Sequence, residues 1–133
     1  MNEILPLGVA RQLVPYGNHV LGAMFLNYNH IIDETLRNTF DKISKQINGF
    51  YFGRFDLRCT SIEDLKTGTN ISILELNGAA AEPAHIYDPG FSYIKAQFVL
   101  GRHFKMMYEA SKENQKNGAK LMTFETFKRS RYL

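Results

Sequence analysis

The sequence has little cysteine and no tryptophan: one cysteine, Cys59, stands alone in 133 residues. A single cysteine cannot form a disulfide within the chain, and it excludes metal sites built from cysteine clusters. The longest apolar run, Val20–Leu26, has seven residues, whereas a membrane-spanning helix needs about 20. The first four residues lack the basic start and the long apolar run of a secretory signal peptide. These absences predict a soluble, cytoplasmic protein.

The residues that are present are typical of one globular domain. Apolar residues make up 44% of the chain and charged residues 22%, and ten Phe and seven Tyr can supply a core. The net charge is +3, with a basic cluster of Lys128, Arg129 and Arg131 near the C-terminus. Nucleic-acid binders usually carry a basic stripe with aromatic residues or a recognisable motif, and neither occurs here. Nucleic acid is therefore not an expected partner, and no membrane partner is expected.

Hydrophobic periodicity predicts an α+β fold with a small antiparallel sheet packed against helices. Two strand-like runs, 4–14 and 20–26, flank a loop at 15–19 that contains Pro, Gly and Asn. Helices are expected at 32–47 and 91–117, because apolar residues recur there every three or four positions. The expected buried stripes are Ile32, Leu36, Phe40, Ile43 and Ile47 in the first helix and Tyr93, Ala96, Leu100, Phe104 and Met107 in the second. A short helix is expected in the tail, 121–133.

Two strands, 50–59 and 71–77, are expected to form an antiparallel hairpin whose connection carries a helical turn near Ser61. The first strand alternates between two faces. One face is apolar and should be buried: Tyr51, Gly53, Phe55, Leu57 and Cys59. In the second strand, Ile71, Ile73, Glu75 and Asn77 are expected to share a face. If the hairpin pairs, Arg54 and Asp56 lie beside Glu75 and Asn77.

This constellation is typical of a magnesium site next to a phosphate. Carboxylate and amide oxygens from Asp56, Glu75 and Asn77 are the ligands that Mg²⁺ prefers, completed by water and phosphate. A guanidinium at Arg54 is suited to bind a phosphate or a developing oxyanion. The alternative interpretation is a solvated cross-strand face of ion pairs, which contributes little to stability.

The same residues carry a resemblance to a known family. The segments Gly53-Arg54-Phe55-Asp56-Leu57-Arg58 and Ile73-Leu74-Glu75-Leu76-Asn77-Gly78 resemble the C-terminal active-site strands of the ATP-grasp superfamily. The likeness is greatest to the D-alanine–D-alanine ligase-like branch, which has an R-x-D strand, an E-x-N strand and a loop of small residues. It extends over roughly residues 30–110 and includes the order of the flanking helices.

The resemblance implies a carboxylate–amine ligase that uses ATP and Mg²⁺ (or Mn²⁺) and proceeds through an acylphosphate. Asp56, Glu75 and Asn77 would then be the metal ligands, and Arg54 would be the catalytic residue that stabilises the transferring phosphoryl group. The chain has no Gly-rich phosphate loop and no upstream nucleotide-binding lobe. We therefore expect the C-terminal lobe of a longer ligase, inactive alone and completed by a missing N-terminal lobe. The loop after Asn77 departs from the family pattern, which has a Pro-Gly pair soon after this position, and this leaves the acceptor open.

Six further residues are weaker candidates for phosphate or substrate binding: Arg58, Asn18, His19, Gly78, Glu82 and His85. For each there is a plain structural alternative, such as a turn, a solvated charge or a loop histidine bonded to the backbone. The competing function is a non-catalytic interaction or oligomerisation module that keeps the sheet without its chemistry. A homo-oligomer is possible under this interpretation, because a surface left apolar would favour self-association.

Overall fold

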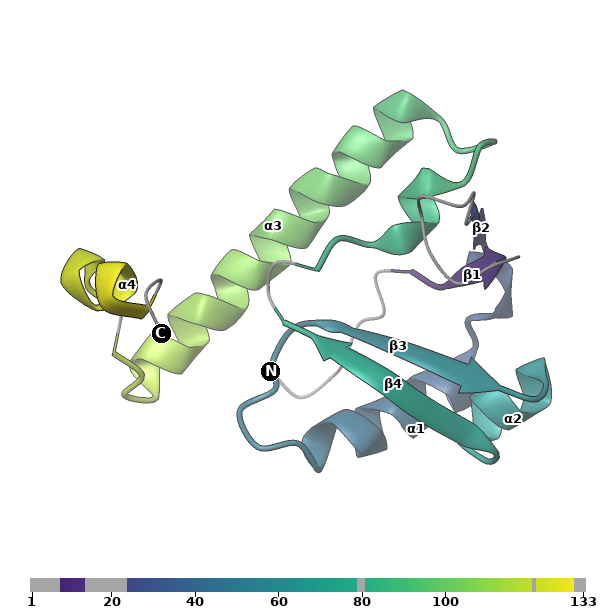
Figure 1. The fold of residues 1–133 in the computed structure, drawn as a ribbon, viewed down its shortest axis with the longest axis horizontal. Helices are drawn as coiled ribbons and strands as arrows, with labels where there is room; N and C mark the ends of the chain where they lie inside the picture. The colour runs from purple at the N-terminus through teal and green to yellow at the C-terminus, as the bar shows by residue number, and fades with distance from the viewer. Residues whose placement is uncertain (1–7, 14–23, 79–80, 121, 131–133) are drawn as a thin grey trace.

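The computed structural model describes residues 8–13, 24–78, 81–120 and 122–130, and within them the chain is an α+β protein. These residues form two separate two-stranded antiparallel sheets, β1–β2 and β3–β4, together with four α-helices and two 3₁₀ turns (Figure 1). The α+β class is confirmed. The expectation of one small sheet is not met within the described residues, because the N-terminal strands pair with each other and not with the second hairpin.

The first sheet pairs β1 (Ala10–Leu13) with β2 (Met24–Asn27), with Ala10 opposite Asn27. A 3₁₀ turn, η2 (Asn29–Ile31), follows β2. The sheet is attached to a segment far along the chain, because Asp88 Oδ2 accepts a hydrogen bond of 2.6 Å from the backbone N–H of Asn27. Asp88 directly follows the second 3₁₀ turn, η3 (Ala84–Tyr87). This bond holds β2 beside the loop that follows β4.

Helix α1 (Glu34–Lys45) begins where Asp33 accepts a hydrogen bond from the backbone N–H of Leu36, as an N-cap residue does. Leu36 is buried, and the ring of Phe40 lies 5.7 Å from that of Phe55 on β3. The predicted first helix is thus confirmed. Its expected buried stripe is confirmed in part, because Leu36 is buried, Phe40 and Ile43 are half-buried, and Ile32 and Ile47 lie outside the helix. Figure 1 shows α1 lying along the β3–β4 hairpin.

The second sheet pairs β3 (Arg54–Cys59) with β4 (Ile71–Asn77), and helix α2 (Ile62–Thr67) lies in the connection between them. Ser61 caps α2 by accepting from the backbone N–H of Asp64. The hairpin and its helical turn are confirmed.

One feature of the hairpin was not predicted. Leu74 is an extra residue between the pairs Asp56–Glu75 and Leu57–Ile73, which makes a β-bulge. The bulge places Ile73 on the opposite face from Glu75, so the expectation that they share a face was wrong. The expected buried position of Cys59 was also wrong, because its side chain is exposed at the end of the strand.

Helix α3 (Tyr93–Lys116) and helix α4 (Phe124–Ser130) complete the described chain. The residues buried on α3 are Ala96, His103 and Ala110. The predicted stripe was partly wrong, since Tyr93 and Phe104 are 77% and 54% exposed. The ring of His103 packs edge-on against Phe52, with centroids 4.7 Å apart, and this contact joins α3 to the residues just before β3. Within the described ranges, no helix is long and apolar enough to cross a membrane.

Candidate functional site

The register of the second sheet brings the four principal candidate residues together at one end of the hairpin. Arg54 lies opposite Asn77, and Asp56 lies opposite Glu75. Since side chains two apart on a strand share a face, all four side chains emerge on the same side. The bulge at Leu74 lies beyond the Asp56–Glu75 pair, on the side away from Arg54 and Asn77. It therefore leaves this arrangement intact.

Within this cluster Asp56 accepts three hydrogen bonds. Arg54 donates two of them, from Nε to Oδ1 at 2.7 Å and from Nη2 to Oδ2 at 3.0 Å. Asn77 donates the third, from Nδ2 to Oδ2 at 2.9 Å. The third nitrogen of the guanidinium, Nη1, donates to the backbone carbonyl of Glu82 at 3.0 Å. Arg54 therefore joins the hairpin to the loop that follows β4.

The charges around Arg54 stabilise its protonated form. Its pKa is raised, chiefly by the hydrogen bonds to Asp56 and also by the negative charges of Asp56 and Glu75. Two carboxylates directly opposite each other on an antiparallel pair repel one another. The guanidinium of Arg54, which binds Asp56 and also interacts with the charge of Glu75, offsets part of this repulsion.

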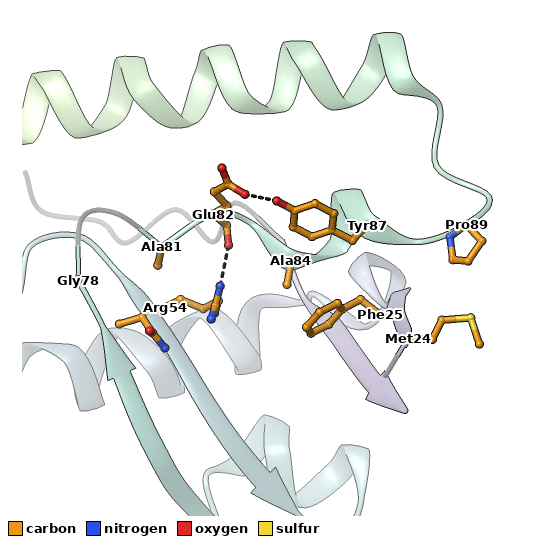
Figure 2. A pocket seen from close by; sticks show the side chains of 10 residues that line it. Met24, Phe25, Arg54, Gly78, Ala81, Glu82, Ala84, Tyr87 and Pro89 are labelled. Carbon is orange, nitrogen blue, oxygen red and sulfur yellow. Dashed lines mark hydrogen bonds between the residues drawn. The ribbon is translucent and has the colours of Figure 1, made fainter. Parts of the chain in front are cut away.

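A cavity of about 770 Å³ opens beside this cluster (Figure 2). Arg54 and Asn77 line it from the hairpin. The other lining residues are mostly small or apolar and come from β2 and from the loop around η3: Met24, Phe25, Gly78, Ala81, Glu82, Ala84, Tyr87 and Pro89. The cavity thus has a polar end at the hairpin and an apolar wall facing it.

Glu82 and Tyr87 form a second polar contact at the cavity. The hydroxyl of Tyr87 donates a hydrogen bond to Glu82 Oε2. This bond is the main cause of a raised pKa for Tyr87, since it favours the protonated phenol. Figure 2 shows the Glu82 carboxylate directed toward Tyr87 while its backbone carbonyl faces Arg54. Glu82 thus contacts both sides of the cavity.

The weaker candidates lie in different places. Gly78 lines the cavity, and Arg58 is exposed farther along β3, opposite Ser72. His85 is 2% exposed and packs edge-on against Phe91, so it is enclosed in the protein rather than among the lining residues. Burial lowers the pKa of His85. Asn18 and His19 lie outside the described residues.

Sequence reasoning missed the apolar wall of the cavity, formed by Met24, Phe25, Tyr87 and Pro89. Tyr87 and Pro89 carried a weak signal, because they follow the small-residue loop closely in the chain. Met24 and Phe25 carried none. They come from a strand about thirty residues before the hairpin, and no local pattern shows that β2 packs against η3.

Across the described part of the chain, no group of three or more His, Cys, Asp or Glu side chains is arranged to hold a metal ion. A cation at Asp56 and Glu75 would therefore draw its remaining ligands from Asn77, water or a bound phosphate. A scan against protein-family models, a search of curated proteins and a search of solved structures each found no match to this chain.

Proposed function

We propose that this chain provides the metal- and phosphate-binding strands of an ATP- and Mg²⁺-dependent carboxylate–amine ligase. The ligase would be similar to the D-alanine–D-alanine ligase-like branch of the ATP-grasp superfamily, with this chain as its C-terminal lobe. The observation that carries the proposal is the register that sets Asp56 opposite Glu75, with Arg54 and Asn77 one pair closer to the cavity. A reaction on ATP also favours the cytoplasm as its location.

The residues fit a magnesium ion on chemical grounds. Two facing carboxylates and a neighbouring amide supply the hard oxygen ligands that Mg²⁺ prefers, and one or two carboxylates plus phosphate oxygens are its usual protein site. The like charges of Asp56 and Glu75 repel each other, and a divalent cation between them would remove that repulsion. In such a site, bound Mg²⁺ neutralises the phosphate charge of the nucleotide.

Arg54 has the role of binding the transferring phosphoryl group. Its side chain is about one third exposed, so its ion pair with Asp56 contributes little stability and can be exchanged. A cation at Asp56 would compete with Arg54 for that carboxylate, and the planar fork of the guanidinium would then be available to hold two phosphate oxygens. The same positive charge then stabilises the acylphosphate and the tetrahedral intermediate formed by the attacking amine.

The cavity has the space for the part of the substrate next to the phosphate. Its volume of about 770 Å³ lies within the usual range of ligand sites. The apolar wall of Phe25, Tyr87 and Pro89 would contact the carbon skeleton of a small carboxylate or amine. Under this proposal the base of the nucleotide would be bound by the upstream lobe of the ligase.

The test is Mn²⁺ binding, followed by the relaxation of water protons, with and without ADP. Three variants are measured beside the wild type: Asp56→Asn, Glu75→Gln and, as a matched control, Glu63→Gln on α2. Circular dichroism first establishes that each is folded. We expect binding that tightens with ADP, is lost in the first two variants and is unchanged in the control. Equal binding by the wild type and Glu75→Gln, or no binding by the folded wild type, would contradict the proposed site.

A further inference from the structure

Helix α3 is apolar on two opposite faces. Its buried residues, Ala96, His103 and Ala110, are spaced seven apart. Ile94, Gly101 and Tyr108 are spaced in the same way but begin two residues earlier. At about 100° per residue, this offset places them about 200° around the helix, on the side away from the protein.

The outer face and one flank of the helix carry large side chains that the described chain leaves exposed. We call this surface the aromatic face, and its residues, with their exposed fractions, are Tyr93 (77%), Ile94 (68%), Phe98 (76%), Phe104 (54%) and Tyr108 (63%). Tyr93 and Phe104 lie on the flank, about 60° and 80° around the helix from Ala96. Figure 1 shows α3 along one edge of the molecule, leading to α4. A large exposed apolar patch with polar residues around it is typical of a protein interface.

Four of the five residues of the aromatic face are arranged symmetrically about Gly101, and the fifth, Tyr93, has no apolar counterpart. Ile94 and Tyr108 are each seven residues from it, and Phe98 and Phe104 are each three residues from it. If two copies of α3 packed antiparallel with Gly101 at the crossing, Ile94 would meet Tyr108 of the other copy and Phe98 would meet Phe104. A two-fold contact requires this kind of self-complementary surface.

Gly101 suits the crossing point. A Cβ added to Gly101 would have no atom within 4 Å, so the position opens to the outside of the helix. A glycine inside a helix costs about 1 kcal/mol relative to alanine. Its lack of a side chain allows a second helix to approach closely, and the bulky residues on either side can then interlock.

The size of the aromatic face agrees with an interface between proteins. Four aromatic side chains of about 200 Å² each, more than half exposed, and one isoleucine leave roughly 600–700 Å² per chain. A standard stable interface buries about 800 Å² per partner. The backbone and polar groups between these side chains would supply the remainder.

Charge favours the antiparallel direction over the parallel one. Lys105 and Lys112 lie on the same side of the helix as Gly101. Lys105 pairs with Glu109, and Lys112 lies over the ring of Tyr108. In an antiparallel pair centred on Gly101, the two copies of Lys105 are about 12 Å apart along the axis, at 1.5 Å per residue. A parallel pair in register would place each copy of Lys105 beside the other and each copy of Lys112 beside the other. The like charges would then repel, which disfavours the parallel arrangement.

We propose that this chain forms a two-fold homodimer through the aromatic face of α3, with the helices antiparallel and crossing at Gly101. This interaction is independent of the proposed nucleotide site, which lies on the β3–β4 hairpin. The sequence also allowed the alternative function of an oligomerisation module, and the aromatic face is the surface through which such a module would associate.

The first test is sedimentation velocity of the full chain over a wide range of concentration, for the wild type, Phe98→Glu and Lys95→Gln. The two substitutions change the charge by the same amount, and Lys95 is exposed outside the aromatic face. We expect a wild-type dimer whose dissociation constant rises at least roughly 30-fold in Phe98→Glu, as at an interface hot spot, and stays unchanged in Lys95→Gln. Phe98 is 76% exposed, so the variant should remain folded, and circular dichroism checks this.

The second test determines direction by disulfide crosslinking in a Cys59→Ser background. Gly101→Cys should crosslink to itself, and Ile94→Cys should crosslink to Tyr108→Cys when the two proteins are mixed. Self-crosslinking of Ile94→Cys without the mixed product would overturn the antiparallel arrangement. A wild type that is monomeric at every concentration, or a dimer unaffected by Phe98→Glu, would overturn the proposal and assign the aromatic face to another partner, such as the upstream lobe.

Discussion

Asp56 lies directly opposite Glu75 in the β3–β4 pair, and the guanidinium of Arg54 binds both oxygens of Asp56. Like charges in this cross-strand position destabilise a sheet by up to about 1 kcal/mol. The hairpin therefore carries an unfavourable pair of acids whose repulsion any bound cation reduces. In the structure the guanidinium of Arg54 supplies this positive charge. This relationship makes the face responsive to metal ions and to substitutions of Arg54.

Arg54→Ala removes the internal cation and leaves the two acids uncompensated. We expect the free energy of unfolding at neutral pH to fall by about 0.5–1 kcal/mol, a small value because the ion pair is partly exposed to solvent. Adding Mg²⁺ should restore more stability to the variant than to the wild type, since no guanidinium competes for Asp56. Urea unfolding with and without Mg²⁺ measures both effects. An equal response of the two proteins to Mg²⁺ would show that Arg54 does not compete with a cation.

Asn77→Asp should separate metal binding from stability, because the two are expected to change in opposite directions. Without metal, a third carboxylate beside Asp56 and Glu75 adds repulsion and removes the hydrogen bond that Asn77 donates to Asp56. Stability should fall by about 1 kcal/mol or more. With Mn²⁺, the same carboxylate is a stronger ligand than the amide, and affinity should rise.

The matched control for this prediction is Asn38→Asp, which adds the same charge on the exposed side of α1. It should change neither Mn²⁺ affinity nor its dependence on ADP. Measurement is by water-proton relaxation for affinity and urea unfolding for stability. If Asn77→Asp weakened Mn²⁺ binding in a folded protein, Asn77 would not be near the cation.

The local parts of the site could be predicted from the sequence. Alternation along β3 and β4 places Arg54, Asp56, Glu75 and Asn77 on one face, because strand side chains alternate strictly. The bulge at Leu74 could not be foreseen from alternation alone. It inserts one residue into a run in which Ile73, Leu74 and Leu76 are all apolar, so both registers gave plausible patterns.

The remaining differences arise from tertiary packing. Periodicity on α3 predicted a buried stripe that included Tyr93, Ala96 and Phe104. The structure buries Ala96 as predicted, and it also buries Ala110 and His103, which the stripe did not include. The small size of the two alanines lets the helix approach the protein, and His103 meets Phe52. Likewise Asn27 and Asp88 are 61 residues apart, and their hydrogen bond follows from no local signal.

Gly8→Ala should destabilise the protein, because Gly8 lies directly against the buried ring of His85. A Cβ at this position would overlap the imidazole and come within 2.8 Å even of Cγ. Forcing a methyl group into a packed site typically costs about 1–3 kcal/mol. Gly78→Ala is the matched control, since its Cβ would have nothing within 4 Å. Urea unfolding should show the loss for Gly8→Ala alone, and equal stabilities would mean that His85 can move away freely.

The two buried histidines should make stability fall as the pH is lowered below neutrality. Burial is the main cause of a lowered pKa for both His85 and His103; for His103 the charge of Glu82 and the Ala81 backbone act in the opposite direction. Above the ordinary pKa of 6.5, each ring is neutral whether the chain is folded or unfolded, and stability is complete. Below it, the unfolded chain binds protons that the folded chain does not, so unfolding becomes easier until the folded pKa is reached. The slope is at most about 1.4 kcal/mol per pH unit for each histidine.

The measurement is the free energy of unfolding in urea at a series of pH values between 7.5 and 5, chosen to span roughly one unit or more on either side of an ordinary histidine pKa. His103→Gln should reduce the slope, and His85→Gln should reduce it too if that variant folds. His30→Gln, which replaces an exposed histidine, is the matched comparison variant. The rings nearest to the two histidines are apolar, with Phe91 beside His85 and Phe52 and Phe104 beside His103. Glu82 is the acid whose charge acts on His103, and burial outweighs it. A slope unaffected by His103→Gln would show that this ring accepts a proton in the folded protein.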